Sequence, residues 1–212
     1  MEWNVTFTNH IRYIERGILK SSFLSGTACD KLIGLVCEHS RLHGGWTRDD
    51  PEVYSQTTTD LEVDCMPTVR EFLNQIDFVE TLQKFCMQAF DVRITAMDDV
   101  FVVRYAAEAQ NALEMHTDAG DISFMVALSA PDLDYGGGGT YFEEIDQVIA
   151  LQKGQMLLFD AKLFHRGMPI TFGERYLLVG FCFTSPSAAK HPGNVALDFT
   201  LIRRCEENFH TV

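Results

Sequence analysis

Apolar residues recur every three or four positions in two segments of the first hundred residues. One segment is Asp30–His39, and the other, longer one is Pro67–Phe90. This spacing is typical of amphipathic helices, and Pro67 suits a first helical turn, where its missing N–H costs little. The pattern therefore predicts one helix in each segment. Between them, residues 43–59 lack apolar periodicity and are predicted to form a long surface loop, a kind of segment that often carries function.

After Phe90 the pattern changes to short runs rich in Val, Ile and Phe, separated by Gly, Pro and Asp. These runs are predicted to be strands; they cover residues 91–96, 99–105, 112–116, 122–129, 139–143, 147–151, 155–159, 163–169 and 175–184. In the last run the side chains alternate, so that Arg175 and Leu177 face one side and Tyr176 and Leu178 face the other. Several short strands at close spacing indicate a β-sandwich or barrel, and the preceding helices make the predicted fold class α+β.

The length of 212 residues suits one large domain. We expect a single domain over residues 1–212, with a helical part over about 1–90 and a β-rich core over about 91–184. Residues 185–212 would form a C-terminal extension. The sequence contains no internal repeat or low-complexity tract that would divide it further.

The chain is strongly acidic, with 17 Lys and Arg residues against 30 Asp and Glu residues and a formal net charge of −13. A field of this sign repels phosphate backbones and anionic lipid, so neither nucleic acid nor a membrane is an expected partner. The charge either keeps the protein soluble or attracts a basic substrate. The oligomeric state is left open by the sequence.

The six cysteines show no close pairing such as CxxC, and we expect them to be reduced. The N-terminal region carries charges that interrupt any signal-peptide pattern, and no apolar stretch approaches the length of a membrane span. A cytoplasmic location is therefore expected.

Candidate chemistry begins with His116 and Asp118, which end one predicted strand. Residues i and i+2 of a strand face the same side, so this pair offers an imidazole and a carboxylate to one metal ion. His165, in a later predicted strand, supplies a second imidazole. Two histidines and one carboxylate form the facial triad of non-haem Fe(II) oxygenases, whose open positions suit a bidentate oxyacid and oxygen.

Arg175 follows on the predicted inner face of the last strand. Burying an arginine is costly unless it forms a fork with a carboxylate. 2-Oxoglutarate fits both requirements, because it offers a keto acid to iron and a distal carboxylate to Arg175.

Several short motifs occur in order between Val102 and Phe183. They are Val103-Arg104-Tyr105, His116-Thr117-Asp118, the run Ile122–Leu128, Asp134-Tyr135 followed by Gly136–Gly139, Lys153-Gly154 before Met156–Phe159, His165-Arg166-Gly167 and Gly173–Tyr176. This stretch, roughly two-fifths of the chain, resembles the 2-oxoglutarate/Fe(II)-dependent dioxygenase family, in its prolyl/lysyl hydroxylase branch.

The resemblance implies a double-stranded β-helix, or jelly roll, with the N-terminal helices packed on one sheet. It assigns Fe(II) ligation to His116, Asp118 and His165, and the cosubstrate salt bridge to Arg175. Tyr105 matches a tyrosine that lies beside the cosubstrate in this branch. The implied activity is hydroxylation of a peptidyl proline or lysine with Fe(II), 2-oxoglutarate and O₂, with ascorbate as a candidate reductant. Arginine rather than lysine at this position is more similar to the lysyl hydroxylases.

The substrate is expected to be a peptide or protein, bound under the loop at residues 43–60. This loop holds a possible Gly44-Gly45 hinge and two large rings, Trp46 and Tyr54, that would grip a chain. Two alternatives stay open. The same chemistry would serve a small molecule such as a free amino acid, and a jelly roll without catalysis would serve as a binding module.

Overall fold

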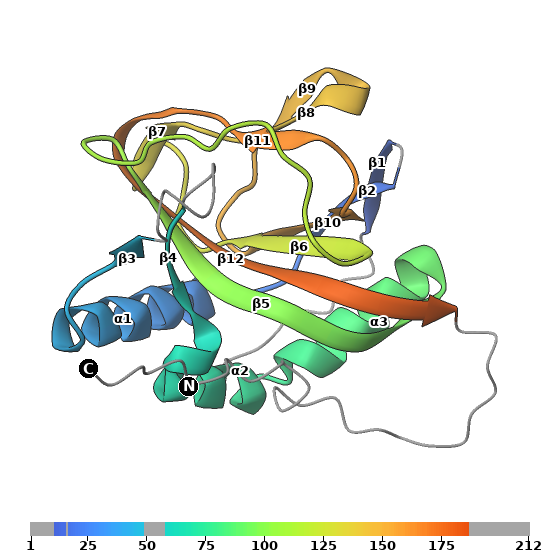
Figure 1. Cartoon of the computed structure of the whole chain (residues 1–212), viewed down its shortest axis with the longest axis horizontal. Helices are drawn as coiled ribbons and strands as arrows, with labels where there is room; N and C mark the ends of the chain where they lie inside the picture. Colours follow the sequence, from blue (N-terminus) through green and yellow to red (C-terminus); the bar gives the residue numbers. More distant parts are fainter. Residues whose placement is uncertain (1–10, 16, 49–57, 187–212) are drawn as a thin grey trace, which may run out of the picture.

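The computed structural model describes residues 11–15, 17–48 and 58–186. Two sheets and three helices form this part of the chain (Figure 1). The helices are α1 (Gly26–Leu42), α2 (Pro67–Gln75) and α3 (Phe78–Phe90). None of them is both long and apolar enough to cross a membrane.

The large sheet has the strand order β1-β2-β10-β6-β12-β5-β4-β3, with β7 pairing the first part of β12. Its strands are β1 (Arg12–Glu15), β2 (Ile18–Ser22), β3 (Thr47–Arg48), β4 (Thr59–Glu62), β5 (Val92–Ala106), β6 (Ile122–Ala127), β7 (Tyr135–Gly137), β10 (Gln155–Asp160) and β12 (Ile170–Pro186). The small sheet has the order β11-β8-β9, from β11 (His165–Gly167), β8 (Thr140–Phe142) and β9 (Gln147–Ile149). Every pairing between these strands is antiparallel, as in a jelly roll.

The large sheet is covered on both faces. Figure 1 shows α1, α2 and α3 on one side of it and the small sheet on the other. The inner strands therefore bury both sets of alternating side chains: Phe124 and Val126 of β6 pack toward the helices, and Met125 and Ala127 pack toward the small sheet. This double burial explains why residues 124–128 are continuously apolar rather than alternating.

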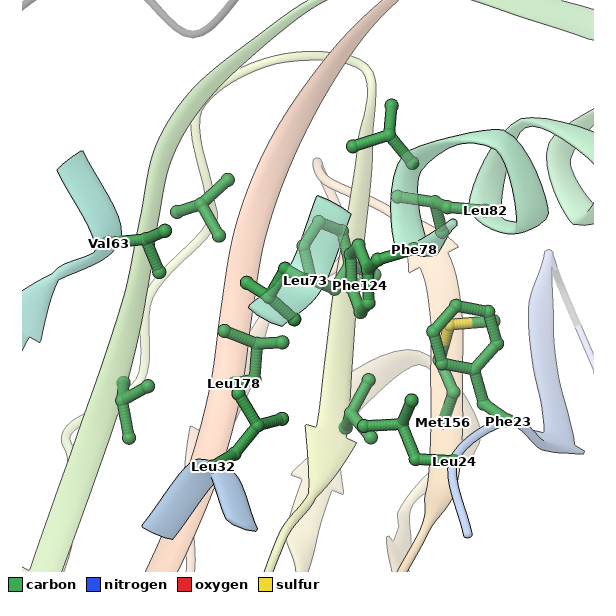
Figure 2. Packing of buried hydrophobic residues seen from close by; sticks show 14 of the residues in the cluster. Phe23, Leu24, Leu32, Val63, Leu73, Phe78, Leu82, Phe124, Met156 and Leu178 are labelled. Atoms are coloured by element: carbon green, nitrogen blue, oxygen red, sulfur yellow. The ribbon is translucent and has the colours of Figure 1, made fainter. Parts of the chain in front are cut away.

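The helix-facing core joins elements far apart in the sequence. In Figure 2, Leu32, Leu73 and Phe78 from the three helices meet Phe124 and Leu178 from the sheet. The N-terminus of α1 is capped by Ser25, whose hydroxyl accepts a hydrogen bond from the Ala28 N–H at 3.2 Å. The helices thus form a layer that supports the sheet from behind, away from the small sheet.

The single helix predicted over Pro67–Phe90 is two helices. Asp77 takes φ 50° and ψ 40°, in the left-handed region, which ends α2 and turns the chain into α3. Aspartate adopts this conformation more readily than most residues. The apolar spacing continues across the break because both helices pack on the same sheet face.

Several strand boundaries also differ from those predicted. The runs 91–96 and 99–105 form one strand, β5, with an irregularity at Asp99, whose φ is 49°. The run 112–116 is not a strand; its last residue alone pairs, through an isolated bridge. Strands β1, β2, β3, β4 and β7 were not predicted, and β3 and β4 occupy the two ends of the expected 43–59 loop. Arg175 lies inside β12 rather than opening it.

Candidate metal centre

The site forms where the two histidines pair through their main chains. The N–H of His116 donates to the carbonyl of His165 and the N–H of His165 donates to that of His116, both at 2.9 Å. Directly opposed residues of an antiparallel pair carry their side chains on the same side, and the two imidazole centroids are 4.3 Å apart. The ring of Phe142, on the neighbouring strand β8, stacks on His165 at 5.6 Å.

Asp118 completes the cluster. Its main-chain N–H donates to the carbonyl of Ala161 at 2.8 Å, and its carboxylate oxygens lie 3.5 Å from His116 Nε2 and 3.6 Å from His165 Nε2. Nitrogen and oxygen atoms of the three side chains all lie within 4.8 Å of one another. The predicted ligands are therefore brought together in a spacing that one ion can bridge.

Hydrogen bonds fix which ring nitrogen of each histidine faces the cluster. His116 Nδ1 donates to the carbonyl of Glu114 at 2.7 Å, and His165 Nδ1 donates to that of Leu163 at 3.0 Å. A carbonyl only accepts, so in a neutral ring the proton is on Nδ1 and the Nε2 lone pair is free. This arrangement is the usual one for histidine ligands of metals, and the donor set suits Fe(II).

The two imidazoles have opposite pKa shifts. Burial lowers the pKa of His165, outweighing the nearby Asp118 carboxylate. Burial acts in the same direction on His116, but the Asp118 carboxylate and the Glu114 carbonyl together raise the pKa of that ring. A cation that bound here would displace the proton from His116 more often than from His165.

Arg175 is 2% exposed, and its guanidinium contacts β8, the strand that pairs with His165 in β11. Its Nη1 donates to the carbonyl of Gly139 at 3.1 Å and its Nη2 reaches the hydroxyl of Thr140 at 3.5 Å, while its Nε is buried without a partner. Among the residues that the structure describes, it forms no ion pair with a carboxylate. A buried cation without an acid is costly, so this position calls for an anionic ligand.

A cavity of about 380 Å³ lies at the cluster and reaches Thr140, which contacts Arg175. Thr140, Leu177 and Met125 line it, together with the three clustered side chains. Leu177, Val179 and Phe181 lie on the same face of β12 as Arg175, and the wall that they form extends roughly 13 Å along that strand. The walls are mostly apolar and exclude water from the polar groups at the inner end.

Tyr105 also lines the cavity and is 3% exposed. Its ring lies 5.5 Å from the Arg175 guanidinium carbon, and burial raises the pKa of its phenol, which therefore stays protonated. Gly167 makes room for it: a Cβ at that position would lie 2.7 Å from the tyrosine hydroxyl. Tyr105 thus lies beside Arg175 at the wall of the cavity.

The structure does not bring Trp46 to the cavity. Its ring packs on the helix-facing core, 5.7 Å from the ring of Tyr176 and 5.7 Å from the Arg104 guanidinium carbon. Because Tyr176 and Arg175 are adjacent in β12, they face opposite sides, and Trp46 lies on the face of the large sheet opposite the cavity. This corrects the expectation that Trp46 lies near the metal cluster, whereas Tyr54 lies outside the described residues.

Of the other residues at the site, Phe101 was not singled out from the sequence. Phe101 and Phe181 form an edge-to-face pair at 5.7 Å at the end of the cavity farthest from Arg175. Lys162 Nζ donates to the main-chain carbonyl of Asp118 at 3.2 Å. The alternation in 175–184 already placed Phe181 on the face of Arg175, but only the β5–β12 pairing reveals Phe101 as its neighbour.

A scan of the sequence against protein-family models finds no match. Procollagen-lysine,2-oxoglutarate 5-dioxygenase 1 from Bos taurus is 30% identical over 168 residues, which is 73% of this chain and 22% of that protein. The chain therefore spans about a fifth of the length of the curated relatives that it matches.

Solved structures share the fold. A viral collagen prolyl hydroxylase from Paramecium Bursaria Chlorella virus-1, in complex with 2-oxoglutarate, is 21% identical with a TM-score of 0.56, covering 79% of this chain and 96% of that one. A Trichoplax adhaerens prolyl hydroxylase, in complex with a hypoxia inducible factor peptide, is 14% identical with a TM-score of 0.59, covering 79% and 84%. The curated relatives of this chain are thus procollagen-lysine 2-oxoglutarate dioxygenases, and its fold is that of 2-oxoglutarate-dependent prolyl hydroxylases, which is consistent with the prolyl/lysyl hydroxylase branch of the 2-oxoglutarate/Fe(II)-dependent dioxygenases.

Proposed function

We propose that this chain is an Fe(II)- and 2-oxoglutarate-dependent dioxygenase that hydroxylates a C–H bond of a peptidyl side chain. One observation carries the proposal: the buried Arg175 has no carboxylate partner among the described residues, and it contacts Thr140, which lines the same cavity as the His116–Asp118–His165 cluster. A cation site and an anion site in such an arrangement suit a ligand that chelates a metal at one end and carries a carboxylate at the other.

In this proposal His116, Asp118 and His165 hold Fe(II) through their Nε2 and carboxylate atoms. Bound iron, with 2-oxoglutarate and O₂, supplies the oxidative chemistry that the side chains of a protein lack. Arg175 binds the distal carboxylate of the cosubstrate through its Nη groups, and Thr140 orients the guanidinium from the cavity side. The protonated Tyr105 phenol offers one further donor to an anion.

The apolar wall has two consequences for this chemistry. It lowers the local dielectric, which strengthens the attraction between Arg175 and an anion. It also keeps bulk water from reactive species, because the walls around the cluster consist largely of side chains such as Val103, Leu113 and Val179. The chain's own part is therefore to bind, orient and dehydrate the reactants.

We infer a peptide or protein as the prime substrate, and a basic one because of the net charge of −13. The relatives that match are named for procollagen lysine, and a structure of the same fold holds a peptide. The outer part of the cavity, at Phe101 and Phe181, leaves an apolar surface for a side chain beyond the metal cluster.

A cytoplasmic location also remains a proposal. Three cysteines, Cys29, Cys86 and Cys182, are buried in the helix-facing core, and burial raises the thiol pKa of Cys29 and of Cys86 to about 12. These thiols therefore act as apolar packing groups, in keeping with a reducing compartment. Imaging of the tagged full-length protein tests the location.

The test of function is turnover of 2-oxoglutarate by the purified protein with Fe(II) and O₂, first alone and then with a library of proline- and lysine-containing peptides. Mass spectrometry should find a gain of one oxygen atom on a peptide, with stoichiometric succinate. Stimulation by a free amino acid instead of any peptide would identify the small-molecule alternative. Absence of both iron binding and 2-oxoglutarate turnover would leave a binding module.

A further inference from the structure

Glu144 lies in the 3-10 turn Glu143–Ile145, which follows β8 beside the metal cluster. Its Oε1 accepts a hydrogen bond from the main-chain N–H of Phe164 at 2.8 Å. In the same turn, the N–H of Glu143 donates to the carbonyl of Phe164 at 3.0 Å. Both main-chain polar groups of Phe164 are thus held by this turn, immediately before His165.

The other carboxylate oxygen, Glu144 Oε2, is buried and has no hydrogen-bond partner in the structure. A buried carboxylate oxygen without a donor is costly, and each such group in a native structure needs a physical reason. No Lys or Arg among the described residues forms an ion pair with Glu144.

A divalent cation at the His116–Asp118–His165 cluster would resolve this imbalance. Attraction between opposite charges is strong in a poorly solvated site, and residues behind metal ligands typically change metal affinity by about 10- to 100-fold. We propose that Glu144 is a positioning residue for His165. Its hydrogen bond to Phe164 fixes the ligand, and its half-buried negative charge strengthens binding of a divalent cation. This inference rests on the metal part of the proposed function.

Titration of the metal-free full chain with Co(II), followed by its visible absorption, tests this inference without any turnover. Glu144→Gln keeps an oxygen that can accept the Phe164 N–H and removes the charge, and it should weaken Co(II) binding about 10-fold. Glu144→Ala removes both the acceptor for the Phe164 N–H and the charge, and it should weaken Co(II) binding further. The matched control is Glu143→Gln, which removes a charge from the exposed neighbour in the same turn and should stay within about twofold of the parent.

Thermal unfolding of the metal-free proteins shows whether each variant folds. If Glu144→Ala does not fold, the Co(II) affinity of Glu144→Gln alone tests the inference. Parent-like Co(II) affinity in a folded Glu144→Gln protein overturns the inference, as does equal weakening by Glu143→Gln. Failure of the parent itself to bind Co(II) overturns the metal centre together with the inference. If Co(II) binds as expected but 2-oxoglutarate is not turned over, the proposed function fails while the role of Glu144 stands.

Discussion

His116 and His165 exchange both of their main-chain hydrogen bonds, each 2.9 Å long, although they lie 49 residues apart in the sequence. The main chain therefore sets the separation of the two imidazoles, while Asp118 is fixed separately by the bond from its N–H to the Ala161 carbonyl. None of these bonds involves a ligand side chain. The fold should consequently survive the loss of any one ligand.

The first prediction concerns these ligands. Asp118→Ala should weaken metal binding by more than about 100-fold, beyond the range for groups behind the ligands, and should abolish 2-oxoglutarate turnover. His116→Ala should do the same. Metal titration measures the loss of binding, and circular dichroism of the metal-free proteins shows whether the fold survives. An Asp118→Ala protein with parental metal affinity and activity would show that the cluster is not the metal site.

A second prediction concerns Arg175, whose guanidinium is buried without an acid among the described residues. Arg175→Met should raise the KM for 2-oxoglutarate by roughly 10- to 150-fold, because a hydrogen bond to a charged group contributes about 1.5–3 kcal/mol. Arg175→Lys keeps the charge without the fork and should have a smaller effect. Steady-state kinetics with 2-oxoglutarate as the varied substrate measure both.

The same substitution should have the opposite effect on the metal-free protein. Because Arg175→Met removes an unpaired buried charge, its free energy of unfolding should equal or exceed that of the parent. Unchanged 2-oxoglutarate kinetics in Arg175→Met would show that another cationic side chain binds the distal carboxylate of the cosubstrate. Lys162 is the alternative to test next, although its Nζ donates to the Asp118 carbonyl instead.

Those parts of the site that depend on short-range geometry could be predicted from the sequence. The spacing of His116 and Asp118 and the alternation along 175–184 follow from the two-residue period of extended chain, and the structure brings these side chains to one cavity. The approach of His165 to the other ligands is long-range, and its prediction rested on the resemblance and on the requirement for a third ligand.

Other features depend on contacts that no local pattern encodes. The break at Asp77 leaves the apolar spacing of Pro67–Phe90 intact, since α2 and α3 pack on one sheet face. Trp46 is a large ring of the kind that can contact a substrate, but it packs on Tyr176, which faces the helices. The partnerless oxygen of Glu144 is visible only once the turn at 143–145 is packed against Phe164.

A third prediction uses the pH dependence of stability on the helix-facing side. Burial tends to raise the pKa of Glu174, but hydrogen bonds from Arg104 and Tyr176 outweigh it and lower that pKa. A carboxyl whose pKa is lower in the folded than in the unfolded state stabilises the fold above its unfolded value of about 4.3, and this contribution disappears as pH falls through the folded value.

Glu174→Gln should therefore be less stable than the parent at neutral pH, and the difference should shrink as pH is lowered below about 4.3. Urea unfolding of both proteins at several pH values measures the difference. Glu38→Gln provides a comparison at a more exposed carboxyl on α1, whose ion pair with Arg41 is screened by solvent and should change stability less. A gap between parent and Glu174→Gln that stays constant down to acid pH would show that the ion pair with Arg104 does not contribute.

The last prediction concerns where the prime substrate binds. Phe181 lines the outer part of the cavity and packs edge-to-face on Phe101, whereas Phe183, two residues further along β12, is 40% exposed and does not line it. Phe181→Ala should raise the KM for the peptide identified in the library by about 10-fold, since aromatic contacts contribute roughly 0.5–1.5 kcal/mol beyond their buried area. It should spare the uncoupled turnover of 2-oxoglutarate, which needs only the metal ligands and Arg175.

Two variants serve as controls. Phe183→Ala should change neither activity, and Trp46→Ala should lower the melting temperature without changing the ratio of coupled to uncoupled turnover. A ratio that falls in Trp46→Ala but not in Phe181→Ala would place the substrate on the helix-facing side of the large sheet and contradict this assignment of the cavity.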